Sequence, residues 1–222
     1  SPVPPIGGLV ILPVFIAVSW HAGLNAIIPW PLAAGLGALL LMGAIDDARS
    51  IKPSIKFAIM LWTACFVVIF GEMQIAHVGN LFGFGVVELG WLSKGFTIMC
   101  LVLLMNALNM MDGVDGLAGG FCALVAFWFL VVCLGADRTG DTQALSILLA
   151  TLLGFLAFNM RAPWRKSASV FMGDSGSLCL GLLIGWFCIR LSQTEGAPLE
   201  PITLIWIIAL PVMDAFALFI TR

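Results

Sequence analysis

Residues 117–134 read LAGGFCALVAFWFLVVCL, without a single charged side chain. About 20 apolar residues in a helix are enough to cross the hydrocarbon core of a bilayer, and this stretch is apolar on all sides rather than along one stripe. Seven further apolar segments follow the same pattern, at approximately 6–20, 26–45, 55–71, 95–110, 144–160, 175–191 and 201–219. Of the 222 residues, 61% are hydrophobic and 10% are charged, whereas soluble domains carry about 25% charged residues. The sequence therefore predicts an all-α polytopic membrane protein with about eight transmembrane helices in a single domain, 1–222.

The basic residues are distributed unequally between the two sides of this predicted bundle. If every segment crosses the membrane, the connectors 46–54, 111–116 and 161–174 lie on one face together with both chain ends. Cytoplasmic faces of membrane proteins carry an excess of Lys and Arg. This face carries seven such residues against three on the other, namely Arg49, Lys52, Lys56, Arg161, Arg165, Lys166 and Arg222 against Lys94, Arg138 and Arg190. We therefore expect it to be cytoplasmic. On the opposite side, the glycines and β-branched residues of 78–87 suit a small β-hairpin.

Charge and cysteine content exclude some classes of function. The net charge is −2 and the basic residues form no cluster, so nothing indicates a nucleic-acid partner. The cysteines stand singly inside apolar segments without a C-x-x-C pattern, at Cys65, Cys100, Cys122, Cys133, Cys179 and Cys188. We interpret them as small buried side chains rather than as metal ligands or disulfides. Because the chain starts at Ser1 and ends directly after an apolar segment, we expect it to be an internal piece of a longer protein.

Acidic residues occur in three clusters, each where an apolar segment meets the expected cytoplasmic face. The first is Asp46-Asp47, directly after the second segment. Acids are unfavourable at the carbonyl end of a helix, by about 0.3–1 kcal/mol each, and two adjacent carboxylates repel each other. The alternative is a solvated turn stabilised by Arg49 and Lys52. Since both local effects oppose this placement, we interpret the pair as functional.

The second cluster is the stretch 106–116, NALNMMDGVDG. Asn106 and Asn109 are three residues apart at the end of a segment, and Asp112 and Asp115 are three apart in the glycine-containing turn that follows. Anionic and amide oxygens are ligands that suit Mg²⁺ or Mn²⁺. The alternative for Asp115 alone is that it caps the helix that begins after it. Capping explains one of the four residues, so the stretch favours a metal or phosphate site.

The third cluster is 171–177, FMGDSGS, at the start of the seventh segment. Free backbone N–H groups at the start of a helix bind phosphate, and glycine permits close approach. Asp174 is equally suited to cap this helix, and Phe171 suits either stacking on a base or anchoring at the membrane interface. Asp214, in the last segment after Pro211, is either functional or bonded to backbone groups that the proline frees.

These clusters resemble the motifs of the polyprenyl-phosphate N-acetylhexosamine-1-phosphate transferase family, glycosyltransferase family 4. The resemblance is carried, in the family's order, by Pro4-Pro5-Ile6-Gly7-Gly8, Asp46-Asp47, the run from Asn106 through Asp112-Gly-x-Asp115-Gly-Leu-Ala118, and Phe171-Met-Gly-Asp-Ser-Gly-Ser177. The second cluster and Trp206–Asp214 are most similar to the bacterial branch that uses UDP-N-acetylglucosamine and undecaprenyl phosphate. The nearest alternative is the branch of phospho-N-acetylmuramoyl-pentapeptide transferases in peptidoglycan synthesis. The family pattern has a further helix before Ser1 and a histidine-containing loop after Arg222.

The resemblance implies a reaction in which a lipid phosphate attacks the β-phosphorus of a UDP-sugar, giving a lipid-diphospho-sugar and UMP. It implies Mg²⁺, with Mn²⁺ as an alternative, at Asn109 and Asp174. It also implies a bacterial inner-membrane enzyme whose active site faces the cytoplasm and which catalyses the first membrane step of a cell-surface polysaccharide. Small-residue faces such as Gly35, Gly37 and Ala38 allow a homodimer.

The resemblance further implies individual roles within the site. Asp46 or Asp47 would engage or deprotonate the lipid phosphate, and Asp112 would support the metal and lipid-phosphate region. The residues expected to bind the UDP-sugar are Asp115, Asn159 and Phe171, with Phe171 stacking on uracil, together with Asn106 and Ser175.

Two other classes of protein remain as alternatives. An ion-coupled transporter would place its ionisable groups near the middle of the bilayer, whereas here Asp214 is the one acidic residue within an apolar segment. A non-catalytic membrane scaffold would not need six acids and amides of this kind together, at Asp46, Asp47, Asn109, Asp112, Asp115 and Asp174. The transferase interpretation accounts for all of them.

Overall fold

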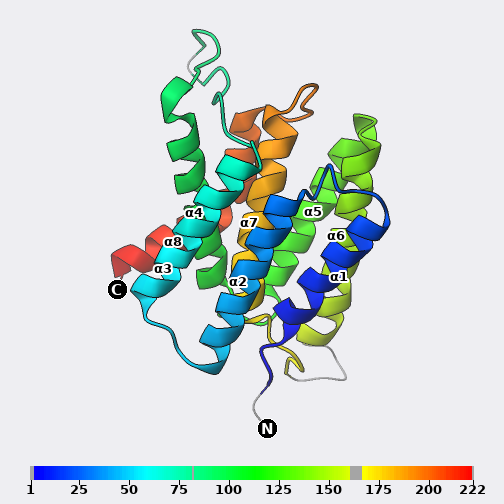
Figure 1. Cartoon of the computed structure of the whole chain (residues 1–222), viewed down its shortest axis with the longest axis vertical. Helices are drawn as coiled ribbons and strands as arrows, with labels where there is room; N and C mark the ends of the chain where they lie inside the picture. The colour runs from blue at the N-terminus through cyan, green and yellow to red at the C-terminus, as the bar shows by residue number, and fades with distance from the viewer. Residues whose placement is uncertain (1–2, 82, 161–166, 222) are drawn as a thin grey trace.

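A computed structural model of the chain describes residues 3–81, 83–160 and 167–221, with side chains up to residue 217. Its described residues form eight α-helices and one short 3₁₀ helix, η1 (Gly90–Leu92). The α-helices are α1 (Gly7–His21), α2 (Trp30–Ala48), α3 (Pro53–Phe70), α4 (Ser93–Met111), α5 (Leu117–Gly135), α6 (Thr139–Asn159), α7 (Gly173–Gln193) and α8 (Pro201–Thr221). Each corresponds to one of the apolar segments expected from the sequence (Figure 1).

Consecutive helices run in opposite directions, so that every second connection returns to the same end of the bundle. In Figure 1, α2, α4 and α6 end at the lower end, where α3, α5 and α7 begin. Six helices have the length and apolar composition to cross a membrane, while Gly7–His21 and Pro201–Ala217 are apolar but shorter. The prediction of an all-α polytopic membrane protein is confirmed. All three acidic clusters lie at the lower end of the bundle, which we call the acidic end.

Helix α7 forms the centre of the bundle. In the part of α7 that can span the membrane, 94% of the residues are buried, against 28% in α3 at the edge. Helix α7 packs against α1, α2, α4, α5 and α8. Small residues make these contacts close: a Cβ on Gly43 would lie 2.3 Å from Ser175 Cα, and one on Gly181 would lie 2.5 Å from Met105 Cα. Helices in lipid associate by this kind of backbone approach, because their apolar side chains gain little by leaving the lipid. The contacts fix the start of α7 against the end of α2.

Gly43→Ala is expected to destabilise the bundle, because the new methyl group would meet the backbone of α7 and not a flexible side chain. Overpacking of this kind costs about 1–3 kcal/mol. The matched control is Gly37→Ala in the same helix, where an added Cβ has no neighbour within 4 Å and alanine favours the helix. Thermal unfolding in detergent should show a lower midpoint for Gly43→Ala and an unchanged or higher one for Gly37→Ala. Equal midpoints for the two variants would contradict the close packing of α2 on α7.

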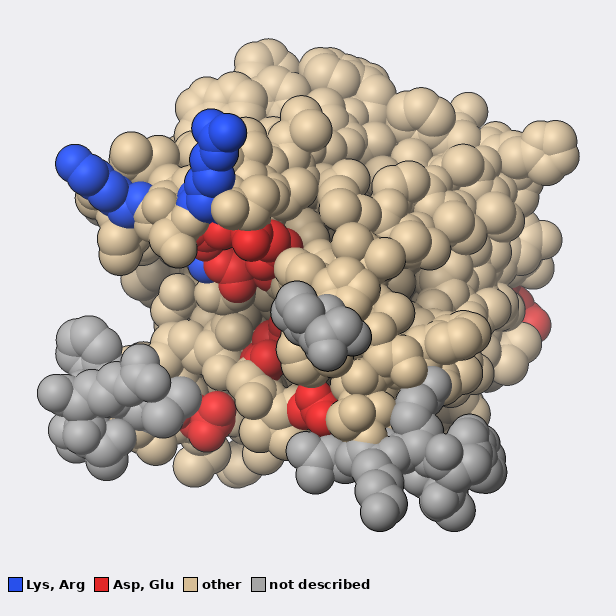
Figure 2. Space-filling model, turned by 90° about the horizontal axis from the view of Figure 1, so that it is seen from below, with Lys and Arg blue, Asp and Glu red and all other residues tan. Residues whose placement is uncertain are grey.

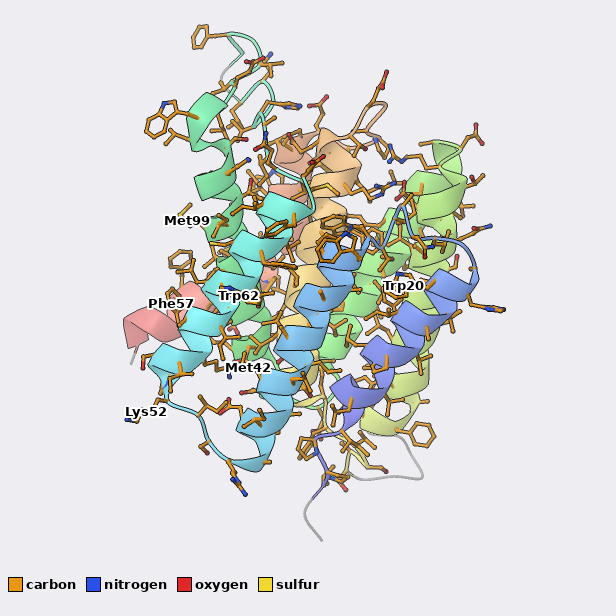
Figure 3. The ribbon with its side chains drawn as sticks, viewed as in Figure 1. Trp20, Met42, Lys52, Phe57, Trp62 and Met99 are labelled. Carbon is orange, nitrogen blue, oxygen red and sulfur yellow. The ribbon has the colours of Figure 1, made fainter. Side chains whose placement is uncertain are left out.

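The outer surface of the bundle is apolar. Figure 3 shows Phe57 and Trp62 on α3 pointing away from the other helices. Trp62 is 58% exposed and stacks on Phe66 at a ring separation of 5.4 Å, whereas Met42 on α2 is 3% exposed. Soluble proteins rarely carry an apolar surface of this extent, so the exposed side of α3 is the surface that lipid covers.

The end of the bundle opposite the acids contains a buried ion network. Asp141 was expected in a connector before a helix starting at 144, but α6 begins at Thr139 and Asp141 is 3% exposed within it. Its carboxylate accepts from Arg138 Nε at 2.7 Å and from Arg190 Nε at 2.5 Å. A buried carboxylate is tolerated when it is paired in this way. The network joins the start of α6 to the end of α7.

The connector between α3 and α4 also lies at this opposite end. Val78 N–H donates to Val87 O at 3.0 Å, and Leu89 N–H donates to Ala76 O at 2.8 Å. Within the part of the chain that the structure describes, this pairing amounts to one isolated antiparallel bridge, His77 with Glu88, and to no regular strand. The expected hairpin is therefore present only as a short paired turn, and its residue Phe82 lies outside the described residues.

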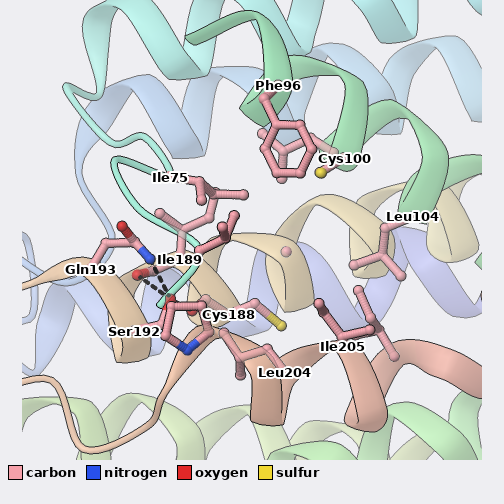
Figure 4. A pocket seen from close by; sticks show the side chains of 15 residues that line it. Ile75, Phe96, Cys100, Leu104, Cys188, Ile189, Ser192, Gln193, Leu204 and Ile205 are labelled. Carbon is pink, nitrogen blue, oxygen red and sulfur yellow. Dashed lines mark hydrogen bonds between the residues drawn. The ribbon is translucent and has the colours of Figure 1, made fainter. Parts of the chain in front are cut away.

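An apolar cavity of about 120 Å³ lies beside this turn, between α4, α7 and α8. Cys100, Cys188 and Leu204 are among the residues that line it, as Figure 4 shows. At its polar rim, Gln193 Nε2 donates to His77 O at 3.1 Å and to Ser192 Oγ at 3.3 Å. All six cysteines are free thiols in the structure, and four of them are buried, namely Cys122, Cys133, Cys179 and Cys188. The cavity is apolar and lies at the end of the bundle opposite the acidic end.

Candidate active site

Four helix ends meet at the acidic end of the bundle. Asp46 and Asp47 lie in the last turn of α2, not in the connector that follows, because α2 continues to Ala48. The start of α3, the end of α4 and the start of α7 lie beside them. Figure 2 views this end and shows acidic side chains gathered near its middle, with Lys and Arg side chains at one side. Carboxylates from segments more than a hundred residues apart thus share one site.

Lys56, in the first turn of α3, lies at the centre of the cluster. Its Nζ lies 3.1 Å from Asp46 Oδ2 and 3.2 Å from Asn109 Oδ1, and it also donates to Asp174 Oδ2. All of these side chains are partly buried, so solvent screens the interactions only in part. Three oxygen atoms from three helices therefore converge on one positive charge.

The orientation of Asn109 is fixed by the helix that it faces. Its Nδ2 donates to Asp174 Oδ1 at 2.7 Å and to Ser177 Oγ at 2.9 Å. Both donors of the amide are used on α7, so its carbonyl oxygen faces Lys56. Ser177 is fully buried and also donates to Gly173 O at 3.2 Å. Asn109 thereby ties the end of α4 to the start of α7.

Asp47 is bound to the start of α7. Its Oδ1 accepts from the Asp174 N–H at 2.9 Å, and its Oδ2 accepts from the Ser175 N–H at 3.5 Å and from Ser175 Oγ at 3.3 Å. The sequence suggested that these N–H groups are free to bind phosphate, and that Asp174 caps its own helix. Instead, the carboxylate of Asp47 receives them, and the Asp174 side chain is turned toward Lys56 and Asn109.

The segment before α7 is held against the start of the chain. Phe171 N–H donates to Pro4 O at 3.0 Å, Gly7 N–H donates to Phe171 O at 2.9 Å, and Gly8 N–H donates to Met172 O at 3.0 Å. A Cβ on Gly8 would lie 2.2 Å from Gly176 N, so only glycine permits this approach. The motif from Pro4 to Gly8 therefore acts as a support for Phe171 and the start of α7.

A cavity of about 320 Å³ opens beside the cluster. Its lining combines carboxylates, an aromatic ring and glycine backbone, and consists of Pro5, Asp47, Asp112, Gly113, Val114, Asp115, Asn159, Phe171, Met172, Gly173 and Asp174. Phe171 is 41% exposed, so one side of its ring is accessible. Asn159, buried at the end of α6, accepts from Gly116 N–H at 2.7 Å and donates to Val170 O at 2.8 Å. It thus holds two walls of the cavity together.

Asp112 lies just beyond the end of α4, within this cavity. Burial, together with the nearby carboxylates of Asp174 and Asp47, raises the pKa of Asp112 to about 7. Its carboxyl group is therefore only partly ionised near neutral pH in the free protein, and a cation bound nearby would favour release of the proton.

Asp112→Asn is expected to flatten the pH dependence of stability measured without divalent metal. The usual pKa of the group is 3.8, so the unfolded chain releases this proton at a lower pH than the folded chain does. The free energy of unfolding should therefore fall as the pH rises from about 4 to about 7, and this contribution should not change above that. Over this pH range, the thermal unfolding midpoint of wild type should fall relative to that of the variant, by about 2–4 °C for each kcal/mol of stability lost. Parallel pH curves for the two proteins would contradict the assignment.

Some expected site residues are not brought into the cluster. Asn106 is exposed on α4, and its amide contacts Met110 Sδ at 3.4 Å. Asp214 is exposed on α8 and does not line the cavity. Ser175 is buried and bonded to Asp47, so it lies behind the cavity lining. The residues that the structure brings together at the cluster or cavity are Asp46, Asp47, Asn109, Asp112, Asp115, Asn159, Phe171 and Asp174.

The cluster fits a hard divalent cation through a mixed donor set. Within the described ranges, no three His, Cys, Asp or Glu side chains form a ready metal-binding group. However, Asp46, Asn109 and Asp174 already direct oxygen atoms at one positive charge, that of Lys56. Mg²⁺ is commonly held by one or two carboxylates together with substrate phosphates and not by a complete protein cage. The donors present suit such a shared site.

The sequence interpretation missed Lys56 and Ser177. Lys56 was counted only as one of the charges that orient the protein, and Ser177 was noted only as the end of a motif. A signal for Lys56 does exist: a lysine in the first turn of a helix, where a positive charge is disfavoured, lies nine residues after an unexplained aspartate pair.

Comparison with known proteins agrees with the motifs. The sequence matches glycosyl transferase family 4 over residues 30–192. It is 32% identical over 187 residues to the undecaprenyl-phosphate alpha-N-acetylglucosaminyl 1-phosphate transferase of Escherichia coli (strain K12), which covers 84% of this chain and 50% of that protein. A protein of the same name from Yersinia pestis is 30% identical over 190 residues, which cover 84% of this chain and 51% of that protein. One from Haemophilus influenzae is 31% identical over 196 residues, which cover 88% of this chain and 55% of that protein. The chain spans about half the length of the curated relatives it matches. Since the matched range includes all three acidic clusters, the chain belongs to glycosyl transferase family 4.

Proposed function

We propose that this protein transfers N-acetylglucosamine 1-phosphate from UDP-N-acetylglucosamine to undecaprenyl phosphate and releases UMP. The observation that carries the proposal is the convergence of Asp46, Asn109 and Asp174 on Lys56 beside a cavity lined by Phe171. A relative from Escherichia coli bears the name of this activity. The site lies at the end of a membrane bundle, where a water-soluble nucleotide sugar can meet a lipid phosphate at headgroup depth.

The reaction is a substitution at phosphorus. An oxygen of the lipid phosphate attacks the β-phosphorus of the donor, and the bond from that phosphorus to the bridging oxygen breaks. The bridging oxygen leaves on the α-phosphate of UMP, and the products are UMP and the lipid-diphospho-sugar. The second pKa of a phosphomonoester is near 6, so the attacking phosphate is already largely dianionic at neutral pH and needs no strong base.

The main task of the protein is to position the reactants and to balance their negative charge. In the proposal, the Lys56 ammonium leaves Asp174 and binds diphosphate oxygens when the donor enters. Asp46 keeps that ammonium oriented from the end of α2. Asn109 and Asp174 would hold Mg²⁺, which supplies charge neutralisation and a Lewis acid at the diphosphate when bound. Asp112 supports the same region from the end of α4.

The cavity is proposed to bind the nucleoside. The accessible side of Phe171 can stack on uracil, and Asp115 offers an acceptor for a ribose or base donor. Asn159 keeps the start of α5 and residue 170 at the spacing that the nucleoside requires. The acidic end would then face the cytoplasm of a bacterium, at the inner membrane, and the reaction would be the first membrane step of a cell-surface polysaccharide. This orientation rests on the excess of basic residues in the sequence. Of those seven, Arg49, Lys52 and Lys56 are at the acidic end, whereas Arg161, Arg165, Lys166 and Arg222 lie outside the described residues.

UMP release by the purified full-length protein in detergent tests the proposal. UDP-N-acetylglucosamine and UDP-N-acetylmuramoyl-pentapeptide are offered in parallel, with Mg²⁺, and with or without undecaprenyl phosphate. Release from the first donor only, dependent on the lipid and abolished by EDTA, is the expected result. Release from the second donor only would assign the protein to the peptidoglycan branch. No release from either donor, with a folded protein, would contradict the proposed reaction.

A further inference from the structure

The two adjacent aspartates of the first cluster point to different elements. Asp46 faces α3, where its Oδ2 binds Lys56 Nζ at 3.1 Å and its Oδ1 accepts from Ile51 N–H at 2.6 Å. Asp47 faces α7, where it accepts from the backbone of Asp174 and from the backbone and hydroxyl of Ser175. The hydrogen bonds of Asp47 thus go to the start of α7 and not to Lys56.

Gly173 makes room for this arrangement. Its φ is +75°, a conformation that favours glycine. A Cβ at this position would lie 2.5 Å from Asp47 Oδ2 and 2.9 Å from Pro5 O. Gly173 therefore allows the Asp47 carboxylate to reach the first N–H groups of α7. Glycine at 173 and aspartate at 47 form one structural unit, although they are more than a hundred residues apart.

The geometry also explains what the contact does for Asp174. The N–H groups at the start of a helix have no partner within the helix and carry partial positive charge. Asp47 Oδ1 binds the backbone N–H of the same residue whose side chain faces Lys56 and Asn109. The position of the Asp174 carboxylate is thereby fixed from behind, and Asn109 fixes it from the other side.

We propose that Asp47 is a positioning residue that acts through the start of α7, and not a base for the lipid phosphate. The proposal rests on the proposed function, because it assigns a role within that site. Receiving two backbone N–H groups requires an oxygen acceptor at this point and does not require a group that takes up a proton. Asparagine keeps an oxygen acceptor for the Asp174 N–H. Its amide nitrogen, in place of Oδ2, would donate to Ser175 Oγ and would leave the Ser175 N–H without its acceptor. Alanine supplies neither the oxygen nor the nitrogen.

Three variants test the role by UMP release: Asp47→Asn, Asp47→Ala and Gly173→Ala. Misplacement of a catalytic group by about 1 Å can lower the rate about 100-fold. We therefore expect Asp47→Ala and Gly173→Ala to lose about 100-fold in kcat, with a higher apparent KM for Mg²⁺. Asp47→Asn should remain within about 10-fold of wild type, with the same pH profile, since it keeps the acceptor of the Asp174 N–H and loses only the charge and the longer contact with the Ser175 N–H. If folded Asp47→Asn is as inactive as Asp47→Ala, the carboxylate itself acts on substrate or metal, and the proposal is overturned.

Hydrogen–deuterium exchange at the Asp174 and Ser175 amides tests the same role without any substrate. Exchange at the Asp174 amide should rise in Asp47→Ala and Gly173→Ala and stay near wild type in Asp47→Asn. Exchange at the Ser175 amide should rise in all three, because an asparagine nitrogen cannot accept its N–H. Unchanged exchange in Asp47→Ala would overturn the positioning role even if every variant is inactive. If the wild-type protein releases no UMP, the proposed function is contradicted. If the variants then still differ from wild type in exchange as expected, the positioning role of Asp47 remains supported.

Discussion

Replacing Asp174 with asparagine is expected to lower kcat about 1000-fold, near the upper end of what removal of one electrostatic group at a reaction centre costs. The carboxylate of Asp174 is the acceptor that Lys56 and Asn109 share. In the substituted protein, an amide of nearly the same shape would stand in its place, with no charge to hold a divalent cation. UMP release at saturating donor and lipid measures the effect, and thermal unfolding confirms that the variant is folded.

Asp137→Asn is the matched control. Asp137 is exposed at the opposite end of the bundle with a φ of 54°, a conformation that asparagine adopts readily. This variant removes the same charge by the same chemical change, and its activity should equal that of wild type. If Asp174→Asn retains more than about a tenth of wild-type kcat, the metal and phosphate roles assigned to the cluster are wrong.

Lys56→Met is expected to lower kcat/KM about 100- to 1000-fold, within the range for loss of a charged group that stabilises phosphoryl transfer. Two effects contribute. The substrate phosphates lose a cationic partner, and Asp46, Asn109 and Asp174 lose the charge on which they converge. Loss of the ammonium should also be visible without substrate, as tighter Mg²⁺ binding to the variant. The ammonium no longer competes with the metal for the oxygens of Asp46, Asn109 and Asp174.

Lys52→Met is the control for Lys56→Met, because Lys52 lies just before α3 on the same face. It is exposed, and Figure 3 shows it pointing away from the bundle. Its substitution should change the activity less than about twofold, as expected for a distant exposed charge that salt screens. Should Lys56→Met keep wild-type kcat/KM, the lysine serves only to balance charge in the empty site, and the proposed contact with the diphosphate is wrong.

The fold could be predicted because each helix carries its own signal. In a bilayer, the low-energy conformation of an apolar run such as 117–134 is a helix, because its backbone hydrogen bonds are then formed within the segment. The structure has α5 at Leu117–Gly135. The errors lie at the ends. The expected start at 26 became Trp30, where Pro29 and Pro31 set the first turn of α2. The expected start at 144 became Thr139. Asp141 is buried near the start of α6, where it pairs with Arg138 and with Arg190 of α7, and the local sequence does not show that Arg190 is near.

The candidate site was only partly predictable, for a different reason. Side-chain types and motif order selected the acids and amides that meet at the acidic end, but they also selected Asn106, which is exposed on α4 outside the cluster. Their partners depend on contacts across the chain: Lys56 meets Asp174 across 118 residues, and Asp47 meets the Asp174 N–H across 127. No local pattern distinguishes Asp46 from Asp47, and only the packing of α2 against α7, close at Gly43, turns them toward different helices.

The fate of the β-phosphate tests the central claim most directly. UDP-N-acetylglucosamine labelled with ³²P at the β-phosphate is incubated with the protein, Mg²⁺ and undecaprenyl phosphate, and the lipid and aqueous phases are separated. Transfer of the sugar together with its phosphate predicts that the label enters the lipid phase in amounts equal to the UMP formed, with none in Asp174→Asn. Label that stays in the aqueous phase as UDP, while the sugar reaches the lipid, would show that the sugar–phosphate bond is broken instead and would contradict the account.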